Sequence, residues 1–396
     1  MTAGFDESAA RGAGAAPAGD GRSADTAPAP GVPPARADRP AAGSAPGAPE
    51  SPARVARGSP AEALAAGAEL ARRHAAAPGA DGGGALDVLV DETLAGLAGL
   101  PPRRREALAR FCAAGLRRFE PSATADDLAA AVVEIAQLDD GLARTFVRGY
   151  RAAGGDPGPD GRLAFLCALR ALVAARRELE RAGQLSGAAA QERMARADEV
   201  LALAERFGWR ARLPQLVCIT GLAASGKSTL AEALAAASGR TVLSSDRIRK
   251  LRAGVDPFER AAPGAYGDAE SRAVYAELAQ RAAATVRAEG GAIVEATFRR
   301  AADAEAFLTG AAAAAKAAWI VCEAPQAILL DRARARALLG SVADADERIV
   351  AAELAVHRGG LQTPGSPLAR LDTTRPVAEL LDDLARTLDL RSDGPP

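Results

Sequence analysis

Short apolar runs alternate with amphipathic stretches along the C-terminal part of the chain. The runs lie at 216–220, 241–244, 292–296, 317–322 and 368–371. Such runs are typical of strands that are buried on both faces of a parallel sheet, and the amphipathic stretches between them are typical of covering helices. The pattern predicts an α/β domain with a five-stranded parallel sheet over residues 214–390.

The preceding residues, 59–209, follow the helical period instead. Apolar positions recur at helical spacing in five segments, which cover 87–100, 102–119, 124–153, 161–182 and 187–207. Order is expected to begin at Ser59, which precedes Pro60 and stands three residues before Glu62, as in a capping box. We therefore predict an all-α region ahead of the α/β domain.

Residues 1–58 are mostly Ala, Gly, Pro, Ser, Asp and Arg, with almost no large apolar side chains. A segment of this kind cannot bury enough surface to offset the entropy of ordering it. The composition predicts a disordered N-terminal tail.

Charge and composition exclude several classes of function. The formal net charge of −1 does not favour broad attraction to nucleic acid or to an anionic membrane. With only two histidines, His74 and His357, a histidine metal site or a Ser-His-Asp triad is not expected. No apolar run amounts to a membrane span, and the N-terminus has no basic segment followed by an apolar core.

The cysteines favour a reducing compartment. All of them lie far apart in apolar segments, which predicts free buried thiols: Cys112, Cys167, Cys218 and Cys322. Together with the missing leader and membrane span, this leads us to expect a cytoplasmic protein.

The most specific motif follows the first predicted strand. Residues 221–229, GLAASGKST, fit G-x-x-x-x-G-K-[ST] at every fixed position, between a strand and a helix. Glycines allow the backbone N–H groups to face a polyphosphate, the lysine reaches the β- and γ-phosphates, and Ser228 can ligate Mg²⁺. We therefore predict binding of ATP and Mg²⁺ by the whole loop, which consists of Gly221, Leu222, Ala223, Ala224, Ser225, Gly226, Lys227, Ser228 and Thr229.

Acidic and basic residues follow the second and third strands, at the sheet edge where ligands bind. Asp246 could accept the proton of an acceptor hydroxyl, and Arg249 could hold an anionic group; alternatively, Asp246 only caps a helix starting at Arg247. Glu295 stands where such proteins place an acid for Mg²⁺, directly or through water, and the alternative is a solvated carboxylate.

A further set of arginines follows the third and fourth strands. Arg299 and Arg300 could meet a substrate or simply be exposed. Arg332 and Arg336 share a helix face and could close over the phosphates as a lid, with Arg334 pointing elsewhere. The alternative is an amphipathic helix with solvated arginines. Residues 340–346 are predicted to form the mobile tip of this lid. Residues 371–374, at the end of the last strand, are predicted to lie near the nucleotide base.

The motifs GLAASGKST, SSDRIRK, AYGDAESRAVY and IVEATF, with the Arg332/Arg336 helix, resemble a bacterial family of P-loop kinases. These proteins are similar to gluconate kinase, to the kinase half of polynucleotide kinase and to zeta toxins. The resemblance implies that Asp246 is the general base, Arg249 a substrate or transition-state contact, and Arg332 or Arg336 the lid arginine. The family usually has Asp where this chain has Glu295, which leaves direct metal ligation open.

Part of the helical region has its own resemblance. Residues 86–91 and 168–173 resemble the C-terminal helices of aminoglycoside-phosphotransferase-like kinases, which precede a P-loop kinase in one bacterial family. The His-x-Asp loop of those kinases is missing, because His74 is followed by two alanines. The region is either a truncated remnant or an unrelated helical bundle, and both readings make it non-catalytic.

These observations predict an ATP-dependent kinase that phosphorylates a hydroxyl on a small molecule. A zeta-like toxin is a narrower variant. The alternatives are a polynucleotide 5′-hydroxyl kinase and a non-enzymatic module that switches with ATP occupancy. The sequence specifies neither the acceptor nor the oligomeric state.

Overall fold

A computed structural model describes residues 58–76, 86–120, 122–158, 161–256, 259, 262–339, 347–357, 361 and 363–391. The chain divides into two units, Met1–Pro49 and Glu50–Pro396. The first unit, and with it nearly all of the predicted disordered tail, lies outside the described residues. So does the predicted mobile tip, 340–346. Both remain predictions.

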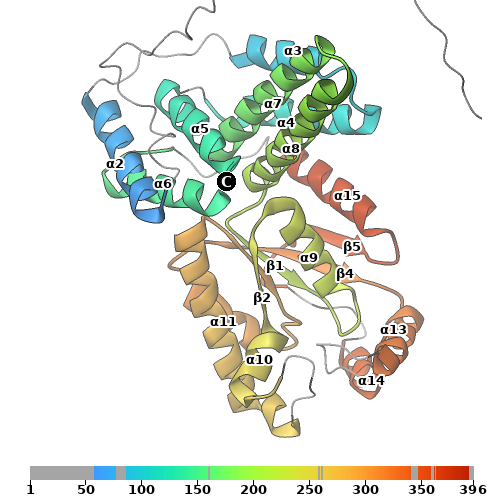
Figure 1. Ribbon diagram of the computed structural model, residues 1–396. Coiled ribbons are helices and arrows are strands. Elements are labelled where there is room, and N and C mark those ends of the chain that lie inside the picture. Colours follow the sequence, from blue (N-terminus) through green and yellow to red (C-terminus); the bar gives the residue numbers. More distant parts are fainter. Residues whose placement is uncertain are drawn as a thin grey trace, which may run out of the picture. The chain divides into compact units, whose positions relative to one another are not determined.

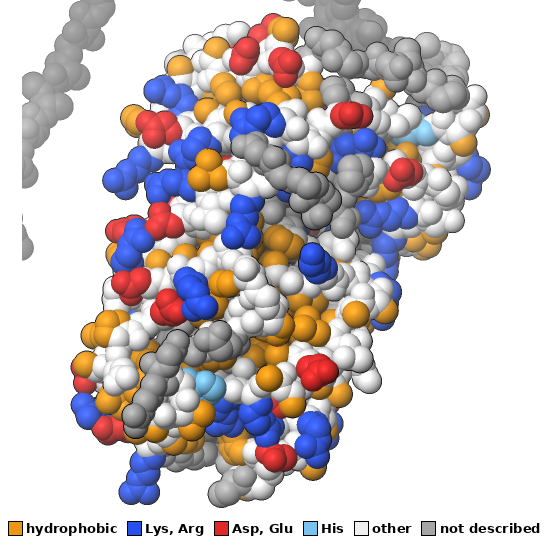
Figure 2. Space-filling view, turned by 180° about the vertical axis from the view of Figure 1, so that it is seen from behind, with side chains coloured by type: hydrophobic (Ala, Val, Ile, Leu, Met, Phe, Trp, Pro, Cys, Tyr) orange, Lys and Arg blue, Asp and Glu red, His pale blue; other side chains and the backbone are white. Residues whose placement is uncertain are grey.

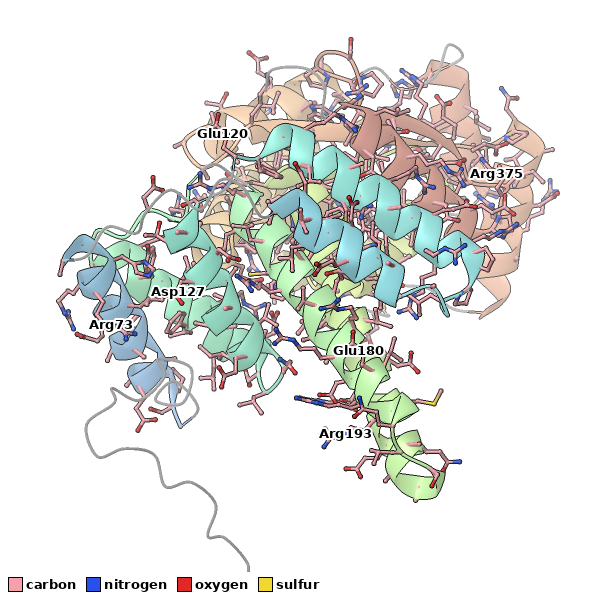
Figure 3. All side chains as sticks on the ribbon, turned by 90° about the horizontal axis from the view of Figure 1, so that it is seen from above. Arg73, Glu120, Asp127, Glu180, Arg193 and Arg375 are labelled. Carbon is pink, nitrogen blue, oxygen red and sulfur yellow. The ribbon has the colours of Figure 1, made fainter. Side chains whose placement is uncertain are left out.

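Seven helices are described ahead of the sheet: α2 (Pro60–Ala76), α3 (Leu86–Gly96), α4 (Pro102–Arg118), α5 (Ala123–Ala136), α6 (Asp140–Ala152), α7 (Arg162–Gly183) and α8 (Gly187–Arg212). The predicted start of α2 is confirmed, since the Glu62 N–H donates to Ser59 Oγ over 3.3 Å. The longest two, α7 and α8, form an antiparallel pair, and an ion pair of 3.0 Å between Glu178 and Arg193 joins them (Figure 3 labels Arg193).

The prediction of a single helix over 124–153 was wrong. The structure has two helices there, α5 and α6, with a break at 137–139. Asp139 adopts an extended conformation and its side chain accepts the N–H of Leu142 over 2.8 Å, so it caps a new helix. Apolar spacing continues across the break, and this conceals the cap in the sequence.

His74 packs within the helical region. Its Nδ1 lies 2.9 Å from the hydroxyl of Tyr150 on α6, and its Nε2 lies 3.1 Å from Asp127 on α5, which Figure 3 labels. The contacts join α2 to two neighbouring helices. The resemblance of this region to aminoglycoside-phosphotransferase-like kinases stays a prediction.

All five predicted strands are confirmed: β1 (Leu216–Thr220), β2 (Thr241–Ser244), β3 (Ala292–Glu295), β4 (Ala317–Glu323) and β5 (Ala369–Asp372). They form one parallel sheet in the order β2-β3-β1-β4-β5. The helices of this part are α9 (Lys227–Ser238), α10 (Ser245–Ala253), α11 (Asp268–Glu289), α12 (Ala301–Ala311), α13 (Gln326–Leu339), α14 (Glu347–Val356) and α15 (Val377–Leu390), with a 3₁₀ turn, η1 (Pro263–Tyr266) (Figure 1).

Helices cover both faces of the sheet, as the apolar strands require. Along β1, Leu216 and Cys218 pack with the core that α11 and α12 contribute to. Val217 and Ile219 point to the other face and pack with α9 and α15. This alternation follows from the two-residue period of a strand.

The predicted free, buried thiols are confirmed for all four cysteines. Burial raises the pKa of Cys112 and of Cys322 to about 12. Desolvation penalises the thiolate, which is the reactive form, so these side chains act as small apolar core residues.

Helix α8 runs almost directly into β1 and joins the helical region to the sheet. Arg212 at its end donates through Nε to Asp389 on α15 over 2.7 Å, and its guanidinium lies 4.5 Å from the ring centre of Phe111 on α4. Both groups of this ion pair are largely buried. Among the described helices, none is long and apolar enough to cross a membrane.

Candidate functional site

The motif at 221–229 folds as a tight loop between β1 and α9. Gly226 has φ +84°, and a Cβ added there would lie 3.3 Å from the Cβ of Thr373, so both conformation and space call for glycine. Ala224 also has a positive φ, +63°, which is uncommon for a side chain with a Cβ. Loop strain of this kind is typical of a backbone held in shape for a ligand.

Two polar side chains of the loop, Ser225 and Lys227, are almost fully buried. Lys227 is 8% exposed, and its Nζ donates to the carbonyl oxygen of Leu222 over 2.9 Å. The hydroxyl of Ser225 is buried and has no hydrogen-bond partner within the described part of the chain. Buried polar groups are normally satisfied, and a phosphate oxygen would supply the missing partner. The loop therefore fits the polyphosphate that the motif predicts.

The structure brings the two predicted metal ligands together. Ser228 Oγ donates to Glu295 Oε1 over 3.1 Å, and Glu295 is 6% exposed. Strand register explains this contact, because Glu295 at the end of β3 pairs with Ile219 of the neighbouring β1. No cluster of three or more His, Cys, Asp or Glu side chains occurs among the described residues. A Mg²⁺ ion here would take its remaining ligands from phosphate and water.

Asp246 lies in the first turn of α10, which begins at Ser245. Ser244, and not Asp246, occupies the N-cap position, so the alternative in which Asp246 caps a helix from Arg247 is wrong in register. Ser244 pairs with Glu295 in the β2–β3 ladder. Asp246 therefore follows its strand at the same carboxyl edge that holds the loop and Glu295.

Arg249 is buried one turn further along α10. Its Nη1 donates to the carbonyl oxygen of Ala265 over 3.0 Å, and its guanidinium lies 4.8 Å from the ring centre of Tyr266. The Nε of Arg249 is buried without a partner among the described residues. A guanidinium held in place with a donor to spare is suited to an anionic ligand.

Tyr275 on α11 binds the segment that follows β3. Its hydroxyl accepts the N–H of Phe298 over 3.1 Å, just past Glu295. Burial raises the pKa of Tyr275 well above its ordinary value, Asp303 and Asp246 raise it further, and Arg249 opposes them. Tyr275 therefore ties the segment that follows β3 to α11.

Of the predicted lid arginines, Arg332 reaches the loop. Its Nη1 donates to Thr373 Oγ1 over 3.1 Å and lies 3.4 Å from the carbonyl oxygen of Ala224, while Nη2 donates to the Thr373 carbonyl over 2.6 Å. Arg334 points away and pairs with Asp331 and Glu347 on the surface. The side chain of Arg336 lies outside the described residues.

Sequence reasoning missed Glu353 on α14. Glu353 Oε2 accepts the backbone N–H of Ala223 inside the loop over 2.8 Å, and the residue is 5% exposed. Arg299 lies 3.5 Å from its other oxygen, whereas Arg300 pairs with Asp303 and Asp268 instead. One signal was available in the sequence: Glu353 stands three residues after Val350 and next to Leu354, on the apolar face of a short helix. Figure 1 shows α14 beside α13.

Residues 216–359 match a protein family described as AAA domain. This range contains the loop, Asp246, Arg249, Glu295 and Glu353, and the match agrees with the parallel α/β core seen here. A comparison with curated proteins found no match.

The chain is also similar to solved structures. A gluconokinase from Sinorhizobium meliloti 1021 is 18% identical, with a TM-score of 0.33, over 46% of this chain and 94% of that one. A sugar kinase from Janibacter sp. HTCC2649 is 16% identical, with a TM-score of 0.34, over 46% and 97%. An APS kinase from Mycobacterium tuberculosis, in complex with AMPPNP and APS, is 21% identical, with a TM-score of 0.30, over 44% and 98%.

Proposed function

We propose that the chain is an ATP-dependent kinase that transfers the γ-phosphate to a hydroxyl group of a small molecule. One observation carries the proposal: β2 and β3 end level with each other, with Ser244 opposite Glu295, and Glu295 bonds Ser228 of the phosphate loop. An acid and an arginine that follow Ser244 therefore stand at the edge where the loop would present a γ-phosphate.

The loop is the ATP site in this proposal. Its backbone N–H groups and Lys227 bind the phosphates, and the hydroxyl of Ser225 gains the partner that it lacks. Ser228 and Glu295 would hold Mg²⁺, which lowers the charge repulsion at the phosphates. The carboxylate of Glu295, one bond longer than that of Asp, lies 3.1 Å from the Ser228 hydroxyl, which supports a metal site shared by the two side chains.

The acceptor site lies beside α10. Asp246 accepts the proton of the acceptor hydroxyl as the new P–O bond forms. Arg249, fixed by Ala265 and Tyr266, uses its unpartnered Nε to hold an anionic group of the acceptor or the transferring phosphoryl group. Arg332, which contacts Ala224 and Thr373, acts as the lid arginine over the bound nucleotide. Arg336 remains a second lid candidate.

The decisive experiment is a metabolite screen for ATP consumption, with the Lys227→Ala chain as the blank. A hit should be saturable and absent from the blank. Asp246→Asn should then lower the rate of transfer to that acceptor by about 100-fold or more, as expected for loss of a general base. Full activity of Asp246→Asn would refute the mechanism, and consumption by the Lys227→Ala blank would refute the ATP site.

A polynucleotide 5′-hydroxyl kinase is the second candidate, because Arg249 and Tyr266 form the basic and aromatic pair that such a site needs. Against this candidate, the chain has a formal net charge of −1, and the face seen in Figure 2 carries interspersed acidic and basic side chains of the described residues. Labelling of a 5′-hydroxyl oligonucleotide with the γ-phosphate of ATP separates the two candidates. Slow ATP hydrolysis with no acceptor in either assay would favour the ATP-responsive switch.

A further inference from the structure

A cavity of about 170 Å³ lies at the opposite edge of the sheet from the phosphate loop. Its walls include Gln215, Arg240 and Gly291, which directly precede β1, β2 and β3. The other walls come from α5, α6, α7 and α8 of the helical region and from the end of α11. Strands of four or five residues separate it from the loop by roughly 15 Å, since a strand rises about 3.3 Å per residue. It is therefore a separate site.

Arginine dominates the lining of this cavity. Six arginines contribute, against two carboxylates, Asp140 and Glu289, which leaves an excess of four positive charges: Arg144, Arg148, Arg151, Arg210, Arg240 and Arg287. They come from three helices and from the turn before β2, so no single amphipathic helix accounts for the cluster. Like charges held together cost free energy unless an anion offsets them.

The two carboxylates do not neutralise the cluster. Asp140 is shared between Arg210 and Arg144, with N–O distances of 2.6 Å to each. Glu289 accepts the hydroxyl of Thr241 over 2.8 Å. No carboxylate of the described residues pairs with Arg148, Arg151 or Arg287, which are all exposed. The guanidinium groups of Arg151 and Arg287 therefore remain for a ligand, as do the N–H groups of Arg148 other than the one that Nη2 donates to Thr145 Oγ1 over 3.1 Å.

The backbone around the cavity is built for these arginines and for an anion. A Cβ on Gly239 would lie 2.7 Å from Arg210 Nη2, and one on Gly291 would lie 2.6 Å from Arg240 Cζ, so the glycines leave room for two guanidinium groups. Helix α7 begins at the wall, where Gly161 provides no side-chain cap, and Leu163 and Ala164 line the cavity. The positive end of a 22-residue helix adds to the field of the arginines.

We propose that this cavity binds a small molecule that carries two or more phosphate groups. Planar guanidinium forks match phosphate oxygens in pairs, and four excess positive charges balance a diphosphate. The volume is several times the roughly 30 Å³ that one water molecule occupies, which suits a small ion and not a polymer. A bound ligand would contact both the helical region and the sheet, and would stabilise their packing.

Inorganic pyrophosphate is the probe for this site, and calorimetric titration of the full chain is the measurement. The Lys227→Ala chain is used so that the phosphate loop contributes little to binding. At about 0.15 M salt and without divalent ions, we expect one saturable event and a rise in Tm, because a ligand that binds only the folded state stabilises it. Wild-type chain saturated with a non-hydrolysable ATP analogue should give the same event.

Variants of the unpaired arginines localise that event. Arg151→Ala and Arg287→Ala, each in the Lys227→Ala chain, should weaken pyrophosphate binding about tenfold or more, since each removes a charge-assisted contact. Both arginines are exposed and unpaired, so the folded state should tolerate their loss. Arg177→Ala is the matched control, an exposed arginine on α7 outside the cavity, and should leave binding unchanged. No saturable binding, or equal affinity in all variants, would overturn the proposal.

Discussion

The carboxylate of Glu353 accepts a hydrogen bond from the phosphate loop, since the backbone N–H of Ala223 donates to its Oε2 over 2.8 Å. The same carboxylate lies 3.5 Å from Arg299 and is almost fully buried. Loop N–H groups of this kind are the donors that bind phosphate oxygens. Helix α14 thus places an anion where our proposal puts a nucleotide phosphate, and ATP must compete with it.

Removing the negative charge of Glu353 should strengthen nucleotide binding. We expect Glu353→Gln to lower the Kd for ATP by about threefold to tenfold, which corresponds to roughly 1 kcal/mol, because a neutral amide neither repels phosphate nor holds the N–H as firmly. Titration with a fluorescent ATP analogue measures the change. Glu347→Gln alters a half-buried acid on the same helix, which pairs with Arg334 and not with the loop, and should have no effect. A weaker affinity in Glu353→Gln would mean that Glu353 supports the nucleotide site.

Two arginines on one helix provide a matched pair. Arg332 contacts Ala224 and Thr373, whereas Arg334 pairs with acids on the surface. Arg332→Ala should reduce phosphotransfer to an identified acceptor at least tenfold, since it removes a charge-assisted contact on the loop. Arg334→Ala should change the rate less than twofold, because exposed ion pairs contribute little. Equal rates in the two variants would remove Arg332 from the site.

The sequence predicts the sheet and the loop well because their signals are local. An apolar β-branched run, a glycine-rich turn and a helix start are contiguous between Leu216 and Leu234, and each strand end follows its own run. The Ser228–Glu295 contact follows from strand order, once the sheet is assumed. For Glu353, helical spacing indicates only a place on the apolar face of its helix, and not its contact with the loop. It reaches the loop from 130 residues away through the packing of α14, and no local pattern records that contact.

The same limit applies to the arginine cavity and to the α5–α6 break. Arg148, Arg240 and Arg287 are unremarkable surface positions in the sequence, and only the packing of the helical region against the sheet brings them together. At the break, the apolar period runs on while one side chain, Asp139, ends the helix. Periodicity reports burial on one face, and it does not report a cap made by a single hydrogen bond.

Glycine at position 226 is required for two separable reasons, and alanine substitutions distinguish them. Gly226 and Gly254 both have left-handed φ, so alanine at either should cost about 1–2 kcal/mol of stability. Only at Gly226 does the new Cβ also approach Thr373, while the space around Gly254 is open. Gly226→Ala should therefore weaken ATP binding at least tenfold, and Gly254→Ala should not. Unfolding in urea and nucleotide titration check both effects, and equal ATP affinity would contradict the tight loop geometry.

Asp140 should make the free energy of unfolding depend on pH under acidic conditions. Burial alone would raise the pKa of Asp140, but the hydrogen bonds and charge of Arg210, with the charges of Arg144 and Arg206, hold it below its ordinary value. A depressed pKa contributes stability above the unfolded value of about 3.9, and this contribution is lost as pH falls through the folded pKa. Asp140→Asn should thus cost roughly 2 kcal/mol at pH 7, as for a hydrogen-bonded charge, and progressively less below pH 4. Urea unfolding between pH 7 and pH 3 measures the difference, with the exposed Asp198→Asn as control. A cost that stays constant down to pH 3 would show that the carboxylate charge is not what stabilises this junction.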